Sequence, residues 1–323
     1  MCSEAFVDLV SPSNIDACWK AMVEIAASSE SYTDIPPLLS NGFIALGFGV
    51  LCFILQALTG NYSHVDRLWS ITPVLYSWNF LVVGLNRGYA LDVRMSIVVG
   101  LITMWGVRLT YNFYRRGGYT WTGEDYRWEF VRKMVPNPFL WHIFSFVFIA
   151  VYQHILLCLL TFPLHVVFTI WANGGSLWSL WDTVLALTFL GLLLVETTAD
   201  QQQYNFQETK WAMIKSGKTL AQLPSPYNLG FCTTGLFAYS RHPNFFAEIS
   251  MWWVVYSFSL IPSGHHNWTL LGALNLFMLF QGSVRLTEYL TSQKYSKYAQ
   301  YQKLVSMLLP MSTPVANLHQ KLD

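Results

Sequence analysis

Charged residues are scarce in this sequence. Only 11% of its 323 residues are Asp, Glu, Lys or Arg, whereas soluble domains contain roughly a quarter. Four long stretches contain no charged residue at all, namely 35–65, 68–86, 134–181 and 249–284. A membrane-spanning helix needs about 20 mostly apolar residues. The stretches therefore predict a protein that crosses a membrane several times.

Clustered cysteines and excess charge are also missing. The five cysteines are scattered, without a Cys-x-x-Cys pair or a Cys/His cluster, so the sequence predicts neither a disulfide framework nor a metal site. The net charge of +1 gives no basic surface for nucleic acid. Gly-x-Ser-x-Gly, His-Glu-x-x-His and Walker patterns are absent, which leaves hydrolase and nucleotide-hydrolysis functions without support.

The apolar segments predict an all-α fold, a polytopic transmembrane bundle of about seven helices. The expected spans are about 38–58, 70–86, 95–113, 139–163, 177–195, 246–262 and 268–284. The fourth apolar stretch, 139–170, is too long for one upright helix, and Pro163 would end or kink it. One tilted helix with an interfacial piece and two short spans both remain open.

The ends of the chain are polar. Residues 1–34 carry six acids and one lysine, which predicts a polar tail with a short amphipathic helix near 15–26. Residues 35–312 would form the membrane-embedded domain. Residues 313–323 would form a C-terminal tail.

The basic residues divide unevenly between the two ends of a seven-span arrangement. Fifteen fall at one end, at position 67, in the loop 114–138, in segment 196–245 and in the C-terminal tail. Only three fall at the other end, and one lies inside the third span. Lys and Arg concentrate on the cytoplasmic side of membranes. We therefore expect a cytoplasmic C-terminus.

A polar face follows the fifth span. Glu196, Asp200, Gln203 and Gln207 lie at positions i, i+4, i+7 and i+11, on one side of a helix. Carboxylates beside a membrane are costly unless they are paired or hydrated. The face therefore predicts a wall against a cavity or basic partners, suited to the ribose or amide parts of a cofactor. A simple solvated exit from the membrane is the alternative.

The third span carries Arg108, Asn112 and Arg115 at the same helical spacing. Arg108 lies about one turn inside the apolar run. Its side chain either extends outward to the lipid headgroups or points inward, as charges within membranes usually do. In the second case it would meet Asp200 or a phosphate.

Residues 235–253 combine a polar cluster with the start of a strongly apolar helix. The polar members are Tyr239, Ser240, Arg241, His242, Asn244 and Glu248. Pro243 suits the first helical position, because its missing N–H is not needed there. Arg241 and His242 would then lie beside free N–H groups at the positive end of a helix dipole, a place that attracts phosphate or carboxylate.

Two other pairs of charged residues lie at the ends of spans. Asp66 and Arg67 are adjacent before the second span, and a local surface pair is the simplest interpretation. Arg285 and Glu288 are one helical turn apart at the end of the seventh span, so they can pair.

These motifs together resemble one family. Segment 236–248, preceded by Ala199-Asp200 and followed by a Lys/Tyr-rich tail that ends at Pro310, resembles the steroid 5-alpha-reductase superfamily. It is especially similar to a branch with a Tyr-Ser-Arg-His-Pro-Asn core. Segments 66–70 and 123–128 are similar to that branch too, so the resemblance covers roughly residues 60–310.

The resemblance implies a steroid 5-alpha-reductase-like membrane enzyme that holds NADPH at the cytoplasmic face. It would transfer hydride to the C=C bond of a hydrophobic substrate of the steroid, enone or fatty-acyl type. On the matching positions, the cofactor site would be lined by Asp200, Tyr239, Arg241, His242, Asn244 and Glu248. The polar residues described above add Arg108, Asn112 and Arg285. In a eukaryotic cell the membrane would be that of the endoplasmic reticulum.

The proton donor is not marked by a motif. Reduction of an enone needs an acid near the carbonyl oxygen as hydride arrives. By chemistry alone, Glu124, Asp66 and Tyr126 are the catalytic candidates.

Two alternatives remain. Membrane methyltransferases that act on isoprenylcysteine or phospholipids share an Arg-His-Pro element, which binds S-adenosylmethionine. They tend to carry paired acids after the last span, where this chain has Arg285-Leu-Thr-Glu288, and this difference favours the reductase. The other alternative is a non-catalytic sterol-binding or scaffold protein, against which the intact Arg-His-Pro-Asn cluster argues.

Overall fold

The computed structural model describes residues 31–311 together with residues 20, 28, 29, 318 and 322. Most of the expected tails, 1–34 and 313–323, and most of the expected amphipathic helix near 15–26 lie outside the described residues. Every regular element in the described part of the chain is helical. The predicted all-α class is therefore confirmed.

The main helices are α3 (Pro37–Thr59), α4 (His64–Leu68), α5 (Thr72–Asn86), α6 (Val93–Arg115), α7 (Tyr126–Met134), α8 (Pro138–Phe144), η2 (Ser145–Tyr152), α9 (Gln153–Leu159), α10 (Pro163–Ala172), α11 (Leu180–Lys215), α12 (Pro243–Ser263), α13 (Leu270–Lys294) and α14 (Tyr298–Leu304). Short 3₁₀ turns are η1 (Tyr32–Asp34), η3 (Leu220–Gln222), η4 (Tyr227–Leu229) and η5 (Gly235–Ala238).

Within the described residues, seven helical segments are long and apolar enough to cross a membrane, as predicted. They are Pro37–Thr59, His64–Asn86, Val93–Arg115, Pro138–Leu159, Leu180–Lys215, Pro243–Ser263 and Leu270–Lys294. The fifth and seventh run well past their expected ends, because polar helical turns continue the apolar ones. Large apolar side chains such as Leu187, Leu194 and Met278 are exposed on the outside, as a surface that faces lipid requires.

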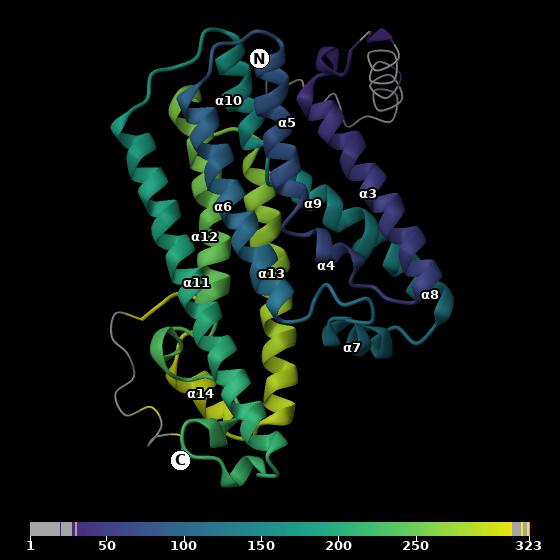
Figure 1. Ribbon diagram of the computed structural model, residues 1–323, viewed down its shortest axis with the longest axis vertical. Coiled ribbons are helices and arrows are strands. Elements are labelled where there is room, and N and C mark those ends of the chain that lie inside the picture. The colour runs from purple at the N-terminus through teal and green to yellow at the C-terminus, as the bar shows by residue number, and fades with distance from the viewer. Residues whose placement is uncertain (1–19, 21–27, 30, 312–317, 319–321, 323) are drawn as a thin grey trace.

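The ambiguous fourth stretch forms a kinked path. Helical residues 138–159 are followed by a turn, and Pro163 then occupies the first position of α10. α10 is a shorter apolar helix of ten residues, and it packs against α12, α5 and α6. Figure 1 shows it above α9, near the upper end of the bundle. The tilted helix with a short extra piece describes this arrangement better than two spans.

Local sequence signals set the helix ends. Proline occupies the first turn of α3, α5, α8, α10 and α12, where a missing N–H is harmless. Asp92 caps α6 by accepting from the N–H of Met95 at 2.8 Å. Ser179 and Asp182 form a capping box at the start of α11. These caps fix where the two long helices α6 and α11 begin.

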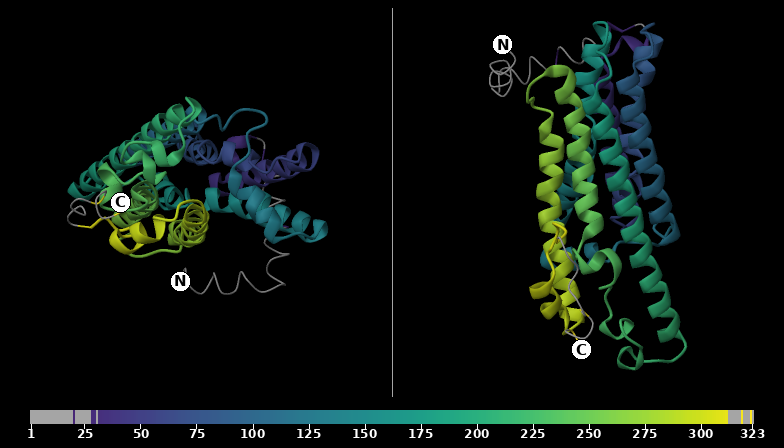
Figure 2. Two further views of the ribbon diagram at one scale, coloured as in Figure 1. Left: turned by 90° about the horizontal axis from the view of Figure 1, so that it is seen from below. Right: turned by 90° about the vertical axis from the view of Figure 1, so that its left-hand side faces the viewer.

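The long helices lie side by side along the molecule. α11 packs on α12 and α6, and α12 packs on α13, while α3 packs on α9 and η2 to one side. The right-hand view of Figure 2 shows α11 and the C-terminal elements extending beyond the other helices at the lower end. The loops after α6, α11 and α13 all lie in the lower half of the molecule in Figure 1, as an even number of crossings between them requires, although α11 and α13 continue further down than α6.

This arrangement predicts a labelling pattern for single cysteines. In a variant with Cys2 and Cys18 replaced by Ser, the remaining cysteines 52, 158 and 232 are buried. Lys133→Cys and Lys303→Cys introduce exposed thiols at the lower end, and His265→Cys introduces one at the upper end.

In sealed vesicles of one orientation, a membrane-impermeant maleimide should label the two lysine replacements from the same side. It should label the histidine replacement only from the opposite side. Labelling of all three from one side would show that the helices do not cross seven times.

Candidate functional site

One arginine and three carboxyl groups meet inside the bundle. Arg108 on α6 places Nη1 2.7 Å from Asp200 Oδ2 and Nη2 2.7 Å from Glu196 Oε2, both on α11. Its Nη2 also lies 3.8 Å from Glu248 Oε2 on α12. All four side chains are nearly buried, with 6–11% of their surface exposed. Arg108 thus points inward and meets Asp200, which was one of the two orientations that the sequence left open.

Glu248 is fixed by two tryptophans. Trp105 Nε1 donates to Oε2 at 2.7 Å, and Trp252 Nε1 donates to Oε1 at 3.0 Å. The two indole rings pack edge to face with centroids 4.9 Å apart. Sequence spacing does not identify these partners. The one available signal is that a buried indole N–H needs an acceptor, and Glu248 is a carboxylate on the same apolar helix as Trp252.

Amide side chains complete the surroundings of Asp200. Asn112 Nδ2 donates to Oδ2 at 2.8 Å, and Asn244 Nδ2 donates to Oδ1 at 3.2 Å. Arg115 holds Asn112 through Nη2, 2.7 Å from Oδ1, and donates to Gln201 at 2.5 Å. Five of the predicted cofactor residues (Arg108, Asn112, Asp200, Asn244 and Glu248) are therefore brought together, from three helices.

The balance of charge in this cluster is unusual for an apolar interior. Glu196, Asp200 and Glu248 surround one buried cation, Arg108. Buried charge is tolerated where it is paired, so the acid excess needs a counter-charge or a proton. Within the described residues, no group of His, Cys, Asp and Glu is arranged to hold a metal ion.

The Arg-His-Pro motif forms a second cluster. Arg241 Nε lies 2.5 Å from Glu288 Oε1, and Nη2 lies 3.0 Å from Oε2, in a bidentate ion pair. Arg241 Nη1 donates to the carbonyl oxygens of Gln302, at 2.8 Å, and of Val305. His242 Nε2 lies 3.1 Å from Glu288 Oε1. A carboxylate of the protein thus fills the guanidinium fork, at a place where the sequence predicts binding of a phosphate or a carboxylate.

The same motif ties down the segment after α14. Backbone hydrogen bonds of 2.8–3.1 Å join Tyr239, Arg241 and His242 to segment 306–311. We call this assembly of the motif, Glu288 and residues 302–311 the C-terminal clasp. Its N–H groups at residues 241 and 242 are occupied by carbonyl oxygens. Among the described residues, no side chain caps α12.

Tyr298 and Tyr301 on α14 pack beside the C-terminal clasp. Burial raises the pKa of Tyr298 and of Tyr301, so both hydroxyls stay protonated and act as donors. Tyr301 donates to the carbonyl oxygen of Phe237 at 2.5 Å, and Tyr298 lies 3.5 Å from Glu288 Oε1. Both pack against Phe231. The motif is therefore the polar part of a compact terminal core.

Arg285 does not take part in either cluster. It is exposed on α13, and no described residue forms an ion pair with it. The expected pairing with Glu288 is wrong, because Glu288 lies on the buried side of α13 and is taken by Arg241 and His242. An exposed ion pair between Arg285 and Glu288 would be weaker than the buried pair of Glu288 with Arg241, whose guanidinium donates two parallel hydrogen bonds to the carboxylate.

Asp66 and Arg67 point to different partners. Asp66 accepts a hydrogen bond from Trp128 Nε1 at 3.0 Å. Arg67 donates to the carbonyl oxygens of Thr120 and Gly123, both at 3.0 Å, and so holds the loop after α6. The simple surface pair is therefore not formed, and each charge fixes a separate segment.

The loop before α7 carries the other candidate acid. Glu124 Oε1 accepts from the N–H of Tyr62 at 2.8 Å. Next to it, burial would raise the pKa of Asp125, but hydrogen bonds and charge from Arg127 outweigh it and lower the pKa. Arg127 also donates to Ser283 on α13 at 2.9 Å. Asp125 therefore stays ionised and holds Arg127, which anchors α7 to α13.

The three candidate proton donors lie apart from Arg108. Asp66 belongs to α4, Glu124 precedes α7, and Tyr126 begins α7 with 58% of its surface exposed. The structure groups them around α4 and α7, whereas the Arg108 cluster lies between α6, α11 and α12. Glu196, a member of that cluster, lies on the polar helix face that the sequence predicts, but helical spacing alone does not single it out as a site residue.

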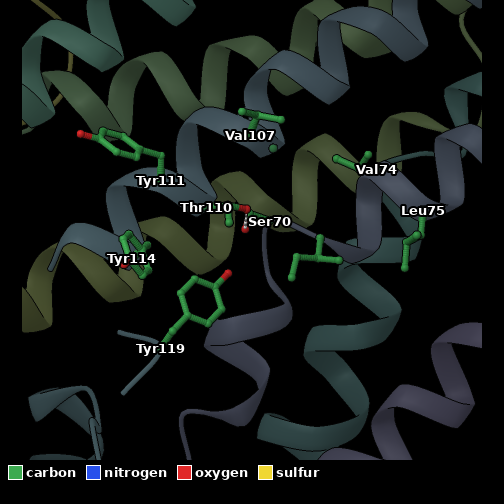
Figure 3. Close-up of a pocket in the computed structure, with 10 residues that line it drawn as sticks. Ser70, Val74, Leu75, Val107, Thr110, Tyr111, Tyr114 and Tyr119 are labelled. Atoms are coloured by element: carbon green, nitrogen blue, oxygen red, sulfur yellow. Dashed lines mark hydrogen bonds between the residues drawn. The ribbon is translucent and has the colours of Figure 1, made fainter. Parts of the chain in front are cut away.

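A groove of about 540 Å³ opens on the outer side of α5 and α6. Its lining residues are Ser70, Ile71, Val74, Leu75, Gly106, Val107, Thr110, Tyr111, Tyr114 and Tyr119. Figure 3 shows the hydroxyls of Ser70 and Thr110 joined at its centre, at 2.7 Å, with tyrosines near one end. A Cβ on Gly106 would lie 2.7 Å from the Ser70 carbonyl oxygen, so glycine permits this close helix contact.

The C-terminal clasp predicts a large loss of stability for Arg241→Ala. The substitution leaves Glu288 buried without its cation, a change that costs about 3–5 kcal/mol. Thermal or denaturant unfolding in detergent measures it. Lys133→Ala is the control, because its pair with Glu129 is exposed and should not change the melting temperature. An Arg241→Ala variant as stable as the parent would contradict the clasp.

Comparison with known proteins places the chain in a family. The model of the family described as "Protein of unknown function (DUF1295)" matches residues 52–305. "Uncharacterized protein C594.04c" of Schizosaccharomyces pombe is 36% identical over 288 residues, which cover 87% of this chain and 82% of that protein. No solved structure matches the chain. The match spans all seven membrane helices in whole or in part and both clusters, and the chain belongs to the DUF1295 family.

Proposed function

We propose that this protein is an integral membrane oxidoreductase that uses NADPH to reduce a C=C bond of a hydrophobic substrate. The observation that carries the proposal is the Asp200 cluster, a set of carboxylate and amide groups at the lower end of an apolar bundle. The resemblance of segment 236–248 to the steroid 5-alpha-reductase superfamily supports it. In a eukaryotic cell we place the activity in the endoplasmic reticulum membrane, with the cluster toward the cytoplasm.

The residues present fit such a cofactor. Ribose hydroxyls need acceptors such as Asp200, and a carboxamide needs the mixed donors and acceptors that Asn112 and Asn244 offer. Arg108 Nε is buried without a hydrogen-bond partner among the described residues. Phosphates need cations, and Arg116 is exposed without a described ion-pair partner, yet close enough to act on Asp200 electrostatically.

The structure changes which residues we assign to the phosphates. Arg241 is engaged by Glu288 and two carbonyl oxygens, so we assign it to holding the start of α12 and with it Asn244. Arg115 stacks on Tyr204, with its guanidinium carbon 4.5 Å from the ring centre. We propose that Arg115 and Arg116 bind the phosphates at the open end of α6.

Bound reduced nicotinamide supplies a hydride, and the chain supplies position, exclusion of water and a proton. Trp105 and Trp252 cover the cluster on its apolar side, and Arg108 keeps its carboxyl groups in place. The α5–α6 groove is open toward the lipid, since Val107 and Tyr111 are mostly exposed. It lies on the opposite face of α6 from Arg108, so we assign it to holding hydrophobic substrate before the reaction.

One observation favours the second candidate, a methyltransferase that uses S-adenosylmethionine. The acid excess around Arg108 would attract the sulfonium cation of that cofactor. The same cluster can therefore accept either molecule, and binding must be measured for both.

The test is thermal stabilisation of the detergent-purified protein by NADPH, NADH and S-adenosylmethionine. A ligand present at 100 times its Kd stabilises the folded state by about 2.7 kcal/mol. We expect NADPH to raise the melting temperature most, because its extra phosphate adds a contact to Arg115 or Arg116. Protection by S-adenosylmethionine alone would replace the reductase with the methyltransferase, and protection by none would favour a non-catalytic protein.

Arg116→Ala locates the phosphate site. The side chain has no described ion-pair partner, so the unliganded melting temperature should not change while the NADPH shift is reduced by more than half. Lys133→Ala removes an equally exposed charge from α7 and should leave the NADPH shift intact. An unchanged shift in Arg116→Ala would remove Arg116 from the site.

A further inference from the structure

The three buried carboxyl groups around Arg108 do not receive equal numbers of hydrogen bonds. Asp200 accepts from Arg108, Asn112 and Asn244, at 2.7, 2.8 and 3.2 Å. Glu248 accepts one indole N–H on each oxygen. Each of these two groups acts purely as an acceptor on both oxygens, which is the behaviour of an ionised carboxylate.

Glu196 differs from both. Among the described residues its close donor is Arg108 Nη2, 2.7 Å from Oε2, and this contact lacks the alignment of a hydrogen bond. The side chain is nearly buried, with 6% exposed. The charged groups that face it are Arg108 from α6, Asp200 from α11 and Glu248 from α12. Burial and two neighbouring negative charges both favour the neutral form of a carboxyl group.

We propose that Glu196 holds a proton in the resting protein and is the acid that delivers it in the reduction. Only the delivery of the proton rests on the proposed reductase function. The presence of the proton on Glu196 does not. The proton removes the negative charge of Glu196 from the cluster. The positive charge of Arg108 then balances one of the two remaining carboxylates, Asp200 and Glu248. The remaining negative charge faces Arg115 and Arg116 at the lower end of α6.

The chemical step balances with this proton. Reduction of a C=C bond consumes one hydride, from the reduced nicotinamide, and one proton. The O–H bond of Glu196 breaks as the second new bond to hydrogen forms on the substrate. Glu196 is then a carboxylate opposite Arg108, and it takes a proton back from water at the lower end after product leaves. Arg108 is thus placed to stabilise the ionised product of the transfer.

Infrared spectroscopy of the unliganded protein tests directly whether Glu196 is protonated. A protonated carboxyl group has a C=O stretching band that is absent from carboxylates and that shifts on exchange into D₂O. We expect this band in the unliganded protein and its loss in Glu196→Gln. Glu196→Asp keeps a carboxyl group and should move the band without removing it. Glu208→Gln, an exposed position on the same helix, should leave the band unchanged.

Stability gives a second, independent measurement. Glu196→Gln replaces a neutral group by a neutral one of the same shape, so the melting temperature should stay within about 2 °C. Glu248→Gln should lower it clearly, because an amide NH₂ would face one of the two indole N–H groups. A spectrum in which Glu196→Gln retains the whole band, or a Glu196→Gln variant less stable than Glu248→Gln, would overturn the inference.

Kinetics separates this inference from the proposed function. If NADPH-dependent reduction occurs, Glu196→Gln should lower kcat about 100-fold with little change in KM, and Glu196→Asp should restore part of kcat. Full activity in Glu196→Gln would exclude Glu196 as the acid while the reductase function stood. If no reduction occurs although the infrared band is lost in Glu196→Gln, the proposed function fails while the proton on Glu196 stands.

Discussion

The burial of Arg108 among three carboxyl groups is the constraint on which the rest of the bundle depends. A guanidinium in an apolar interior is tolerated only where opposite charges meet it. Those charges come from α11 and α12, so the pairing fixes α6 against both helices. At the upper end, Arg94 Nε lies 2.6 Å from Asp182 Oδ1, also between α6 and α11. Two buried arginine–carboxylate contacts therefore set the register of these parallel neighbours.

The C-terminal clasp positions the start of α12, which carries two residues of the Arg108 cluster. Arg241 and His242 precede α12 directly, and Asn244 and Glu248 follow within its first two turns. Holding Arg241 against Glu288 therefore fixes the helix start that places Asn244 on Asp200. A motif that looks like a ligand site in sequence thus acts, in this fold, as the support of a neighbouring site. In the function that we propose, the charge of the cofactor would then be met by side chains without such partners, of which Arg116 is one.

Much of the fold can be predicted from the sequence, because it depends on the composition of each segment or on single residues at the helix ends. Charge-free runs mark the spans, and Pro163 marks the kink between α9 and α10. The contact of Arg108 with Asp200 was one of two orientations consistent with helical spacing, and burial decided between them. The sequence leaves the ligand of Arg241 open, because the guanidinium fork matches a carboxylate such as that of Glu288 as well as a phosphate. Equally, no periodicity shows that Trp105 and Trp252 close on Glu248, since indoles are common at membrane boundaries.

We propose that the cluster beside Trp105 and Trp252 binds a reduced nicotinamide, and energy transfer from tryptophan to the bound ring would report this binding. The emission of tryptophan overlaps the absorption of the reduced nicotinamide ring, so a bound cofactor quenches the protein and emits in its place. We predict saturable energy transfer from the protein to NADPH. The transfer should be abolished when NADP⁺ displaces NADPH, and it should be reduced when Trp105 or Trp252 is replaced by Phe. Absence of transfer at NADPH concentrations that saturate related enzymes, with quenching by S-adenosylmethionine instead, would contradict it.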